Sequence, residues 1–177
     1  MMLSKQKQQT AFDALSGAFG YKNRMAAPRI EKVIVSVGVG KKRDKAQLAL
    51  IADRLVKITG QKASSRPAKQ SIAQFKVREG EVVGYQVTLR GARMYDFLDK
   101  LIHIALPRTR DFRGINTSAV DGMGNMTIGI KEHTIFPETS DEDLKDIFGL
   151  AVTIVTSAAS KEEARAFFDH LGVPFKK

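Results

Sequence analysis

The sequence predicts an α+β fold, in which an antiparallel or mixed β-sheet is backed by helices on one face and carries extended basic loops. Apolar and polar residues alternate over residues 83–90, which is typical of a strand that covers a core with one side only. Over residues 48–58, apolar residues recur at the spacing of one helical face. The length of 177 residues and the hydrophobic share of 43% fit a single globular domain.

The first half of the chain predicts two helices, one strand and one loop. Apolar residues at helical spacing predict a short helix over about residues 1–20, and the β-branched run 30–39 predicts a strand that ends at a glycine turn. The second helix is expected to end at Gly60, because glycine adopts the left-handed conformation of a helix end without strain. Pro67 and its polar neighbours then predict an extended or looped excursion, which Gly80 closes.

The second half predicts three strands and two helices. Beyond the alternating strand, a helix around Met94 is expected to end at Pro107, because proline disfavours helical geometry in the residue before it. A loop rich in Arg and Gly follows at 108–125. Two further strands are predicted at 126–130 and 150–156, and the second holds enough consecutive apolar residues to be central in the sheet.

The last helix is predicted from a capping box. The Ser160 hydroxyl and the Glu163 carboxylate are spaced so that each accepts a hydrogen bond from a free backbone N–H at the helix start. Gly172 and Pro174 are expected to end this helix, since glycine suits the position after the last turn and proline cannot continue it.

Positive charge is concentrated in the first three-quarters of the chain. The whole sequence holds 29 Lys and Arg against 19 Asp and Glu, a net charge of +10. Residues 22–45 contain eight basic and two acidic groups, and residues 61–78 contain five basic groups and no acidic one. Two such stretches favour a polyanionic partner, which gains free energy by releasing counterions, over a basic surface kept for solubility. We therefore expect an RNA-binding sheet with loops over about 28–130, between an N-terminal helix of about 1–20 and an acidic strand and helix of about 131–177.

The reactive residues argue against an enzyme. Without cysteine, the chain has no disulfide, thiolate metal site or cysteine nucleophile. The Gly and Lys residues of 36–42 lack the spacing of a phosphate-binding loop, and the three histidines are far apart, with no second ligand at metal spacing. His103 is expected to be packed or capped within its helix, and the acids 141–143 to stabilise a helix start. We predict no catalytic residue, no metal and no cofactor.

Two other function classes stay open at this point. An enzyme acting on RNA or nucleotides would need convergent acid, base or metal groups, and a general DNA-binding module would have to read a major groove, for which a sheet face with loops is poorly suited. The sequence has neither the apolar core of a signal peptide nor 18 consecutive apolar residues, so we expect a soluble cytoplasmic protein without a membrane partner.

Two candidate RNA contacts have structural alternatives. Phe75 is an aromatic residue within a basic loop, where it either stacks on an unpaired base or anchors the loop to the core. The polar side of the alternating strand, with Gln86, Thr88 and Arg90, either contacts RNA phosphates and 2′-hydroxyls or is simply solvated.

Many short strings along the chain match one family in order and spacing. They are PRIEK at 28–32, GVG at 38–40, ITGQK at 58–62, SIA at 71–73, FKVREG at 75–80, TLRG at 88–91, ALPR at 105–108, RDFRG at 110–114, GIKE at 129–132, IFPE at 135–138 and LGVPF at 171–175. In these strings the chain closely resembles the bacterial large-subunit ribosomal protein L5 family. The strings cover essentially the whole chain, which makes the resemblance specific.

The resemblance implies a non-enzymatic protein that holds 5S ribosomal RNA in the central protuberance of the large subunit, one copy per ribosome. It also implies contacts with large-subunit ribosomal RNA, peptidyl-site transfer RNA and a small-subunit head protein of the S13 type. The residues implied for ribosomal RNA are Lys32, Ser36, Gly38, Gly40, Gln61, Lys62, Lys69, Thr88 and Arg90. Those implied for transfer RNA are Ser71, Gln74, Phe75, Lys76 and Arg78. Those implied for the intersubunit bridge, in the loop 107–121, are Arg108, Arg110, Asp111 and Arg113.

The sequence departs from the family pattern at four positions. The family usually has Asn where Ser36 stands, Gly where Gln74 stands, and Arg and an aromatic residue where Met123 and Met126 stand. Ser36 keeps a hydrogen-bond donor but has a shorter reach than Asn. Gln74 stiffens a loop in which glycine would be freer.

Overall fold

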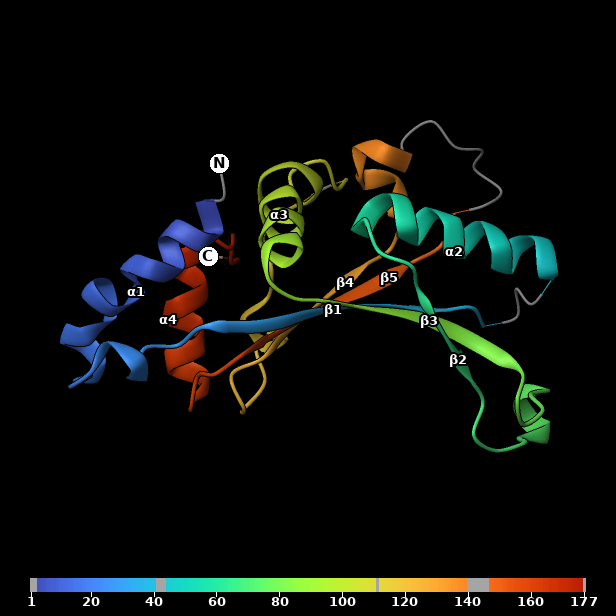
Figure 1. Ribbon diagram of the computed structural model, residues 1–177, viewed down its shortest axis with the longest axis horizontal. Coiled ribbons are helices and arrows are strands. Elements are labelled where there is room, and N and C mark those ends of the chain that lie inside the picture. The colour runs from blue at the N-terminus through green and yellow to red at the C-terminus, as the bar shows by residue number, and fades with distance from the viewer. Residues whose placement is uncertain (1–2, 41–43, 111, 140–146, 177) are drawn as a thin grey trace.

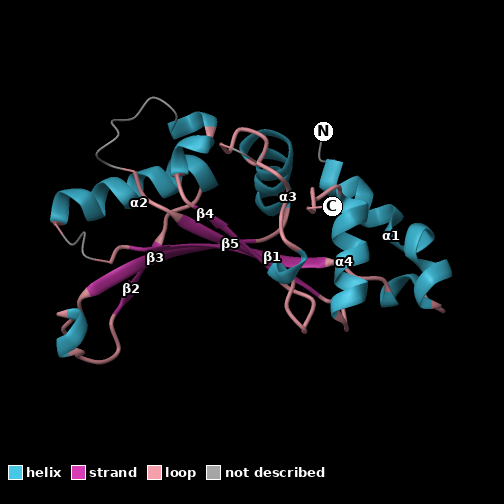
Figure 2. Cartoon of the chain, turned by 180° about the vertical axis from the view of Figure 1, so that it is seen from behind, coloured by secondary structure: helices cyan, strands magenta, loops and turns pink. Residues whose placement is uncertain are grey.

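A computed structural model of the chain describes residues 3–40, 44–110, 112–139 and 147–176. Its centre is a five-stranded β-sheet with helices across one face, as Figure 1 shows edge-on and Figure 2 shows from behind. This arrangement confirms the predicted α+β fold. No helix in these ranges is both long and apolar enough to cross a membrane. The extended form of the basic loops and the division of the domain into three parts stay predictions.

The strands of the sheet are β1 (Ile30–Gly38), β2 (Ser64–Pro67), β3 (Val82–Leu89), β4 (Met126–Ile130) and β5 (Leu150–Thr156). They follow the spatial order β2-β3-β1-β5-β4, and each neighbouring pair is antiparallel. Of the two predicted alternatives, the antiparallel sheet is therefore correct. β5 pairs on both sides, as predicted for a central strand. The sequence did not predict β2, because four residues that end in a proline are too short to show alternation.

The helices are α1 (Leu3–Phe19), α2 (Lys45–Thr59), α3 (Ala92–Lys100) and α4 (Lys161–Leu171). α2 and α3 lie over the sheet, whereas α1 and α4 pack against each other at the end of the sheet where β1 begins (Figure 1). α2 ends at Gly60, whose φ of +68° is the left-handed conformation predicted for it. The predicted helices around residues 1–20 and 48–58 are thus confirmed.

The sheet buries one face against the helices. Val33, Val35 and Val37 on β1 are buried, and their antiparallel register partners on β3 and β5 point to the same side. Burial of each such side chain contributes about 1.5 to 3 kcal/mol to the free energy of unfolding. The opposite face of the sheet has no helix over it in Figure 1 or Figure 2. Alternate side chains of every strand therefore remain accessible on that face.

α3 continues into a π-helical segment, Leu101–Ala105, which the sequence did not predict. The Leu106 N–H donates to the Leu101 carbonyl at 2.9 Å, five residues earlier. The wider turn rotates the following side chains relative to a regular α-helix. The expectation that His103 is packed or capped is accordingly wrong, because this side chain is exposed. The end of the helix before Pro107 is confirmed.

The start of α4 differs by one bond from the predicted capping box. The Glu163 N–H donates to the Ser160 hydroxyl at 3.2 Å, as predicted. The Glu163 carboxylate, however, accepts from the Ala159 N–H at 2.7 Å instead of from the Ser160 N–H. It also accepts a hydrogen bond from the Tyr21 hydroxyl. The hydrogen bond between Tyr21 and Glu163 connects the segment after α1 to α4. It is largely shielded from water, because Glu163 is only 7% exposed.

Some predictions concern residues outside the described ranges. These are the basic residues Lys41, Lys42 and Arg43, the bridge residue Asp111, and the acids at 141–143.

Replacing Tyr21 by Phe should lower the free energy of unfolding by about 1 to 2 kcal/mol, because a buried oxygen of Glu163 loses its donor. Burial, and then the hydrogen bond with Glu163, raise the pKa of Tyr21 above its ordinary value of 10.0. The folded state therefore keeps the phenol proton at a pH where the unfolded state releases it. This contribution to stability is complete below pH 10.0 and falls as the pH rises further.

Urea unfolding followed by circular dichroism, at about pH 7 and about pH 11, measures both effects. The matched control is Tyr85→Phe, which removes a hydroxyl from another half-buried tyrosine. Equal losses of stability in the two variants would show that the bond to Glu163 has no special weight.

Candidate nucleic-acid interface

The sheet face without helix cover, which we call the open face, is defined by the register of the strands. Side chains directly opposite each other in antiparallel strands share a face, so Ser36 lies beside Gln86, and Ile34 lies between Thr88 and Thr153. The residues of the open face are Lys32, Ile34, Ser36 and Gly38 from β1, Ser64 and Arg66 from β2, Gly84, Gln86 and Thr88 from β3, Thr127 and Gly129 from β4, and Ala151, Thr153 and Val155 from β5.

The open face combines hydrogen-bonding groups with a positive electrostatic character. Its polar side chains are hydroxyls, one amide and two cations, and no Asp or Glu occupies any of its paired positions. Two of the hydroxyls, those of Thr127 and Thr153, lie 3.0 Å apart across β4 and β5. Small residues such as Gly38 and Ala151 let a polyanion backbone approach closely. A surface of this kind can contact phosphate and sugar oxygens without repelling them.

The end of α2 is tied to the open face by hydrogen bonds. The Gln61 side-chain amide donates to the Thr88 carbonyl at 3.3 Å. The buried Thr59 hydroxyl bonds to the Leu55 carbonyl at 2.6 Å and to the Gln61 carbonyl at 3.1 Å. These bonds hold Gln61 beside β3, so the structure brings Gln61, Thr88 and the β1 residue Ser36 into one neighbourhood.

The glycine turn after β1 lies where the open face ends. Gly38 is the last residue of β1 and pairs with Gly84. The Val39 N–H donates to the Val83 carbonyl at 3.0 Å, and Gly40 has a φ of +56°, which L side chains rarely adopt. The turn therefore presents backbone without side-chain bulk. This places the predicted residues Gly38 and Gly40 at the margin of the open face.

The residues predicted to contact transfer RNA form a hairpin that projects from the far end of the sheet (Figure 1). Ile72 and Val77 pair through two backbone hydrogen bonds of 3.0 and 3.2 Å. The Ser71 hydroxyl accepts from the Glu79 N–H at 2.9 Å, which closes the base of the hairpin. Lys76 holds a left-handed conformation, with a φ of 52°.

Phe75 lies at the tip of this hairpin and is 65% exposed. A side chain that is so accessible does not anchor the loop to the core, so that alternative is wrong. The neighbouring predicted residues Gln74 and Arg78 are exposed as well. The hairpin therefore presents an aromatic ring, an amide and cations together.

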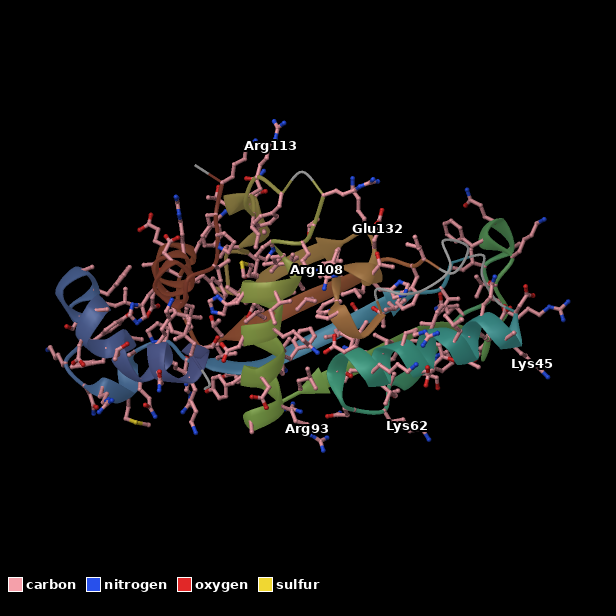
Figure 3. The ribbon with its side chains drawn as sticks, turned by 90° about the horizontal axis from the view of Figure 1, so that it is seen from above. Lys45, Lys62, Arg93, Arg108, Arg113 and Glu132 are labelled. Atoms are coloured by element: carbon pink, nitrogen blue, oxygen red, sulfur yellow. The ribbon has the colours of Figure 1, made fainter. Side chains whose placement is uncertain are left out.

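The arginines predicted for the intersubunit bridge lie on a different part of the molecule. Arg108, Arg110 and Arg113 are exposed on the loop between α3 and β4. In Figure 3, Arg113 points outward on one side of the molecule, and Lys62 points outward on the opposite side. The predicted residues therefore make up three surfaces and not one site.

The remaining predicted RNA contacts lie around the open face. Lys32 is half-buried on β1, Arg90 is exposed directly after β3, and Lys69 is exposed between β2 and the hairpin. Sequence reasoning missed the contributions of β2, Ser64 and Arg66, because that strand is too short for a periodic signal. It also left out Thr127 and Thr153, although the alternation of 126–130 indicated that Thr127 lies opposite the core.

Two of the three histidines, His133 and His170, serve packing, whereas His103 is exposed. Within the described ranges, no cluster of three or more His, Cys, Asp or Glu side chains could hold a metal ion. His133 is buried and stacks on Phe148 at a centroid distance of 4.1 Å. His170 Nε2 lies 2.8 Å from the Lys7 carbonyl, between α4 and α1.

Comparison with known proteins gives matches along most of the chain. Residues 23–78 match the family model of ribosomal protein L5, and residues 82–175 match the model for the C-terminus of the same ribosomal protein family. The large ribosomal subunit protein uL5 of Trichlorobacter lovleyi is 50% identical over 170 residues, which are 96% of this chain and 95% of that protein. The proteins of the same name from Halothermothrix orenii and Thermoanaerobacter sp. are 45% and 46% identical, each over 99% of this chain and over 99% and 98% of their own lengths.

Replacing Phe75 by Ala should change the free energy of unfolding by less than about 0.5 kcal/mol, because the ring is 65% exposed. The control is Phe136→Ala, which removes a ring of 0% exposure and should cost about 3 to 5 kcal/mol. Urea unfolding at neutral pH measures both changes. A large loss for Phe75→Ala would restore the interpretation of this residue as an anchor.

Proposed function

The chain belongs to the ribosomal protein L5 family, and from this premise we propose that the open face of its sheet binds 5S ribosomal RNA. Membership makes the protein a structural constituent of the large ribosomal subunit, in association with ribosomal RNA, and not an enzyme. Its location is the cytoplasm, on the ribosome. The observation that carries the finer proposal is a sheet face that has no helix cover and no carboxylate at its paired positions.

The chemistry of the open face supports RNA as its partner. A phosphate backbone requires donors and cations at short range, and any carboxylate among them would repel it. Ser36, Gln61 and Thr88 offer short polar groups that suit 2′-hydroxyl and base-edge contacts. The cations proposed to neutralise phosphates flank this centre and are Lys32, Lys62, Lys69 and Arg90.

The glycine turn after β1 supports close approach of the RNA backbone. Gly40 has positive φ and no atom within 4 Å of the position that a Cβ would occupy. A side chain there would be strained and would stand between the turn and its partner. We place Gly38 and Gly40 in direct contact with the RNA, and Ser36 makes a shorter contact than the Asn that is usual in the family.

The exposed hairpin supports a second contact, with peptidyl-site transfer RNA. It carries Phe75 and Lys76 at its tip, with Ser71, Gln74 and Arg78 beside them. An accessible aromatic ring can stack on a base, which contributes about 1 to 3 kcal/mol in single-strand binding. The rigid pairing of Ile72 with Val77 would hold this tip at a fixed distance from the sheet.

The arginine-bearing loop supports a third contact, a bridge to a small-subunit head protein of the S13 type. Arg108, Arg110 and Arg113 are exposed on it, at the β4 edge of the sheet, whereas Ser36 and Thr88 lie on β1 and β3. This separation allows the 5S RNA and the bridge to be bound at the same time.

A competition experiment tests the alternative of a general DNA-binding module. Duplex DNA at matched charge should fail to displace 5S RNA from the chain.

Replacing Thr88 by Val should weaken 5S RNA binding about three- to tenfold, because one hydrogen bond is lost while the shape of the side chain is kept. The matched control is Thr10→Val on the exposed surface of α1, outside the open face, which should leave affinity unchanged. Lys69→Ala should in addition reduce the slope of log affinity against log salt by about 0.7 to 0.9. Filter binding over a salt series measures these values, and equal affinity for an unrelated RNA of the same length would contradict the proposal.

Replacing Lys76 by Gly should abolish crosslinking of the hairpin to peptidyl-site transfer RNA, because the charge is removed while glycine keeps the left-handed backbone. Crosslinking with mass spectrometry on native ribosomes reads which nucleotides join to residues 69–78. The control is Lys161→Gly at the exposed start of α4. If the Lys76→Gly variant binds 5S RNA with unchanged affinity, the transfer RNA contact is independent of the open face. If its crosslink to transfer RNA is unchanged, the proposed contact is rejected.

A further inference from the structure

The outer edge of β4 is the feature on which this inference rests. β4 is the last strand in the sheet order. Beyond it, the described residues make only one bridge, between Val120 and Met126 at the beginning of the strand. The backbone groups of residues 127–130 that face away from β5 have no strand beside them in the described ranges. Such an edge is a template for pairing with another extended chain.

A groove of about 640 Å³ runs along this edge. One side is β4, and the other is formed by described residues of the arginine-bearing loop, namely Thr109, Arg110, Phe112, Gly114, Ile115, Asn116 and Ala119. Apolar side chains form about half of the lining, and they include Leu106, Phe112, Ile115, Ile128, Ile130 and Ile135. Buried or half-buried side chains of this kind suit the apolar residues of an added strand.

The wall opposite β4 is held away from the strand by the C-terminal segment. The Ile115 N–H donates to the Pro174 carbonyl at 2.7 Å, and the Lys176 N–H donates to the Ile115 carbonyl at 2.8 Å. Gly114 has a φ of +95°, and a Cβ there would lie 2.7 Å from the Lys176 nitrogen. The backbone of this wall is therefore engaged on its far side, which keeps the groove open toward β4.

Charge at the rim of the groove selects the partner. Arg110 and Lys131 line it, with Glu132 as the one acid among its described lining residues. Arg108 and Arg113 are exposed on the same loop, and Figure 3 shows Arg113 pointing outward beyond β4. This rim attracts carboxylates. It repels a second copy of itself, so pairing of two β4 edges is disfavoured.

We propose that this groove receives an extended acidic peptide segment of another protein, which adds to β4 as a further antiparallel or parallel strand. The segment directs alternate apolar side chains into the groove and its carboxylates toward Arg110 and Lys131. Five residues of β4 span about 17 Å, so about five to six peptide residues fill the edge. The inference rests on the proposed bridge, since it uses the same loop, and it names the chemistry of the partner that this loop accepts.

RNA is the less favoured occupant for a structural reason. Phosphates gain nothing from the apolar side chains that form about half of the lining, among them Ile115, Ile128 and Ile130. The strand edge offers backbone N–H and C=O groups at the repeat of a peptide, which a nucleotide backbone does not match. Cations at the rim alone would serve either partner, so the experiment has to separate the two.

The test titrates the full-length chain against an acetylated, fluorescein-labelled peptide Asp-Glu-Val-Thr-Val-Thr-Val-Glu-Asp and follows fluorescence anisotropy. We expect saturable binding and protection of the amides of 126–131 from hydrogen exchange. N-methylation of two alternate residues should weaken binding about tenfold or more, because it removes two backbone donors. A peptide with Lys in place of its acids should also bind at least tenfold more weakly.

Two variants of the chain locate the site. Ala119→Trp should abolish binding by filling the groove, with Ala49→Trp on the exposed face of α2 as its control. Arg110→Glu with Lys131→Glu should weaken binding at least tenfold, with the exposed pair Lys5→Glu and Lys45→Glu as the control. The second variant keeps the test decisive if Ala119→Trp does not fold.

Three results would overturn the inference. The first is peptide binding that N-methylation does not weaken. The second is displacement of the peptide by an RNA oligonucleotide whose own binding requires Arg110 and Lys131. The third is a concentration-dependent dimer of the chain that the Ala119→Trp substitution abolishes. The same variants are titrated with 5S RNA. Failure of the RNA proposal would leave the peptide titration unchanged, and failure of the peptide proposal would leave the RNA titration unchanged.

Discussion

One-sided burial of the antiparallel sheet is the constraint on which the rest of the structure depends. Each strand alternates, so covering one face with helices satisfies the hydrophobic side chains and leaves the other row in contact with water. Val33, Val35 and Val37 supply the buried row of β1, while Lys32 and Ser36 belong to the exposed row. The same alternation therefore forms both the core and the proposed RNA surface. A second helical layer would have stabilised the fold further and removed that surface.

The position of the helices explains how the three proposed contacts could fit on one small protein. α2 and α3 occupy one side of the sheet, and α1 with α4 occupies one end, which leaves the open face, the hairpin end and the β4 edge free for partners. The open face and the hairpin are continuous with the sheet, whereas the arginine-bearing loop is fixed by the C-terminal segment. Gln61 is bonded to Thr88, and Ile115 is bonded to the C-terminal segment. Such attachments would fix the distances between the proposed partners at the different surfaces.

Sequence reasoning succeeded where one periodic signal determined the outcome. The period of two in 83–90 predicted both β3 and its polar face, and the helical spacing of 48–58 predicted α2 and its end at Gly60. It failed where several elements act together. β2 exists through pairing with β3, and the π-helical turn at Leu101–Ala105 depends on packing that no local pattern records. The Tyr21 partner of Glu163 lies 142 residues away, and no spacing rule connects them. The roles of single residues in the three surfaces are proposals that rest on the family resemblance and on side-chain chemistry.

The parallel bridge between Ile115 and Phe175 determines when, during synthesis, the chain can complete its fold. The middle of the chain receives its backbone partner from a segment that is synthesised 60 residues later, just as β1 receives β5 and α1 receives α4. A nascent chain that stops before residue 150 lacks a neighbour for one whole side of β1 and both hydrogen bonds that fix the arginine-bearing loop. The sheet and the arginine-bearing loop therefore acquire all of their backbone partners only after the C-terminal segment has been synthesised.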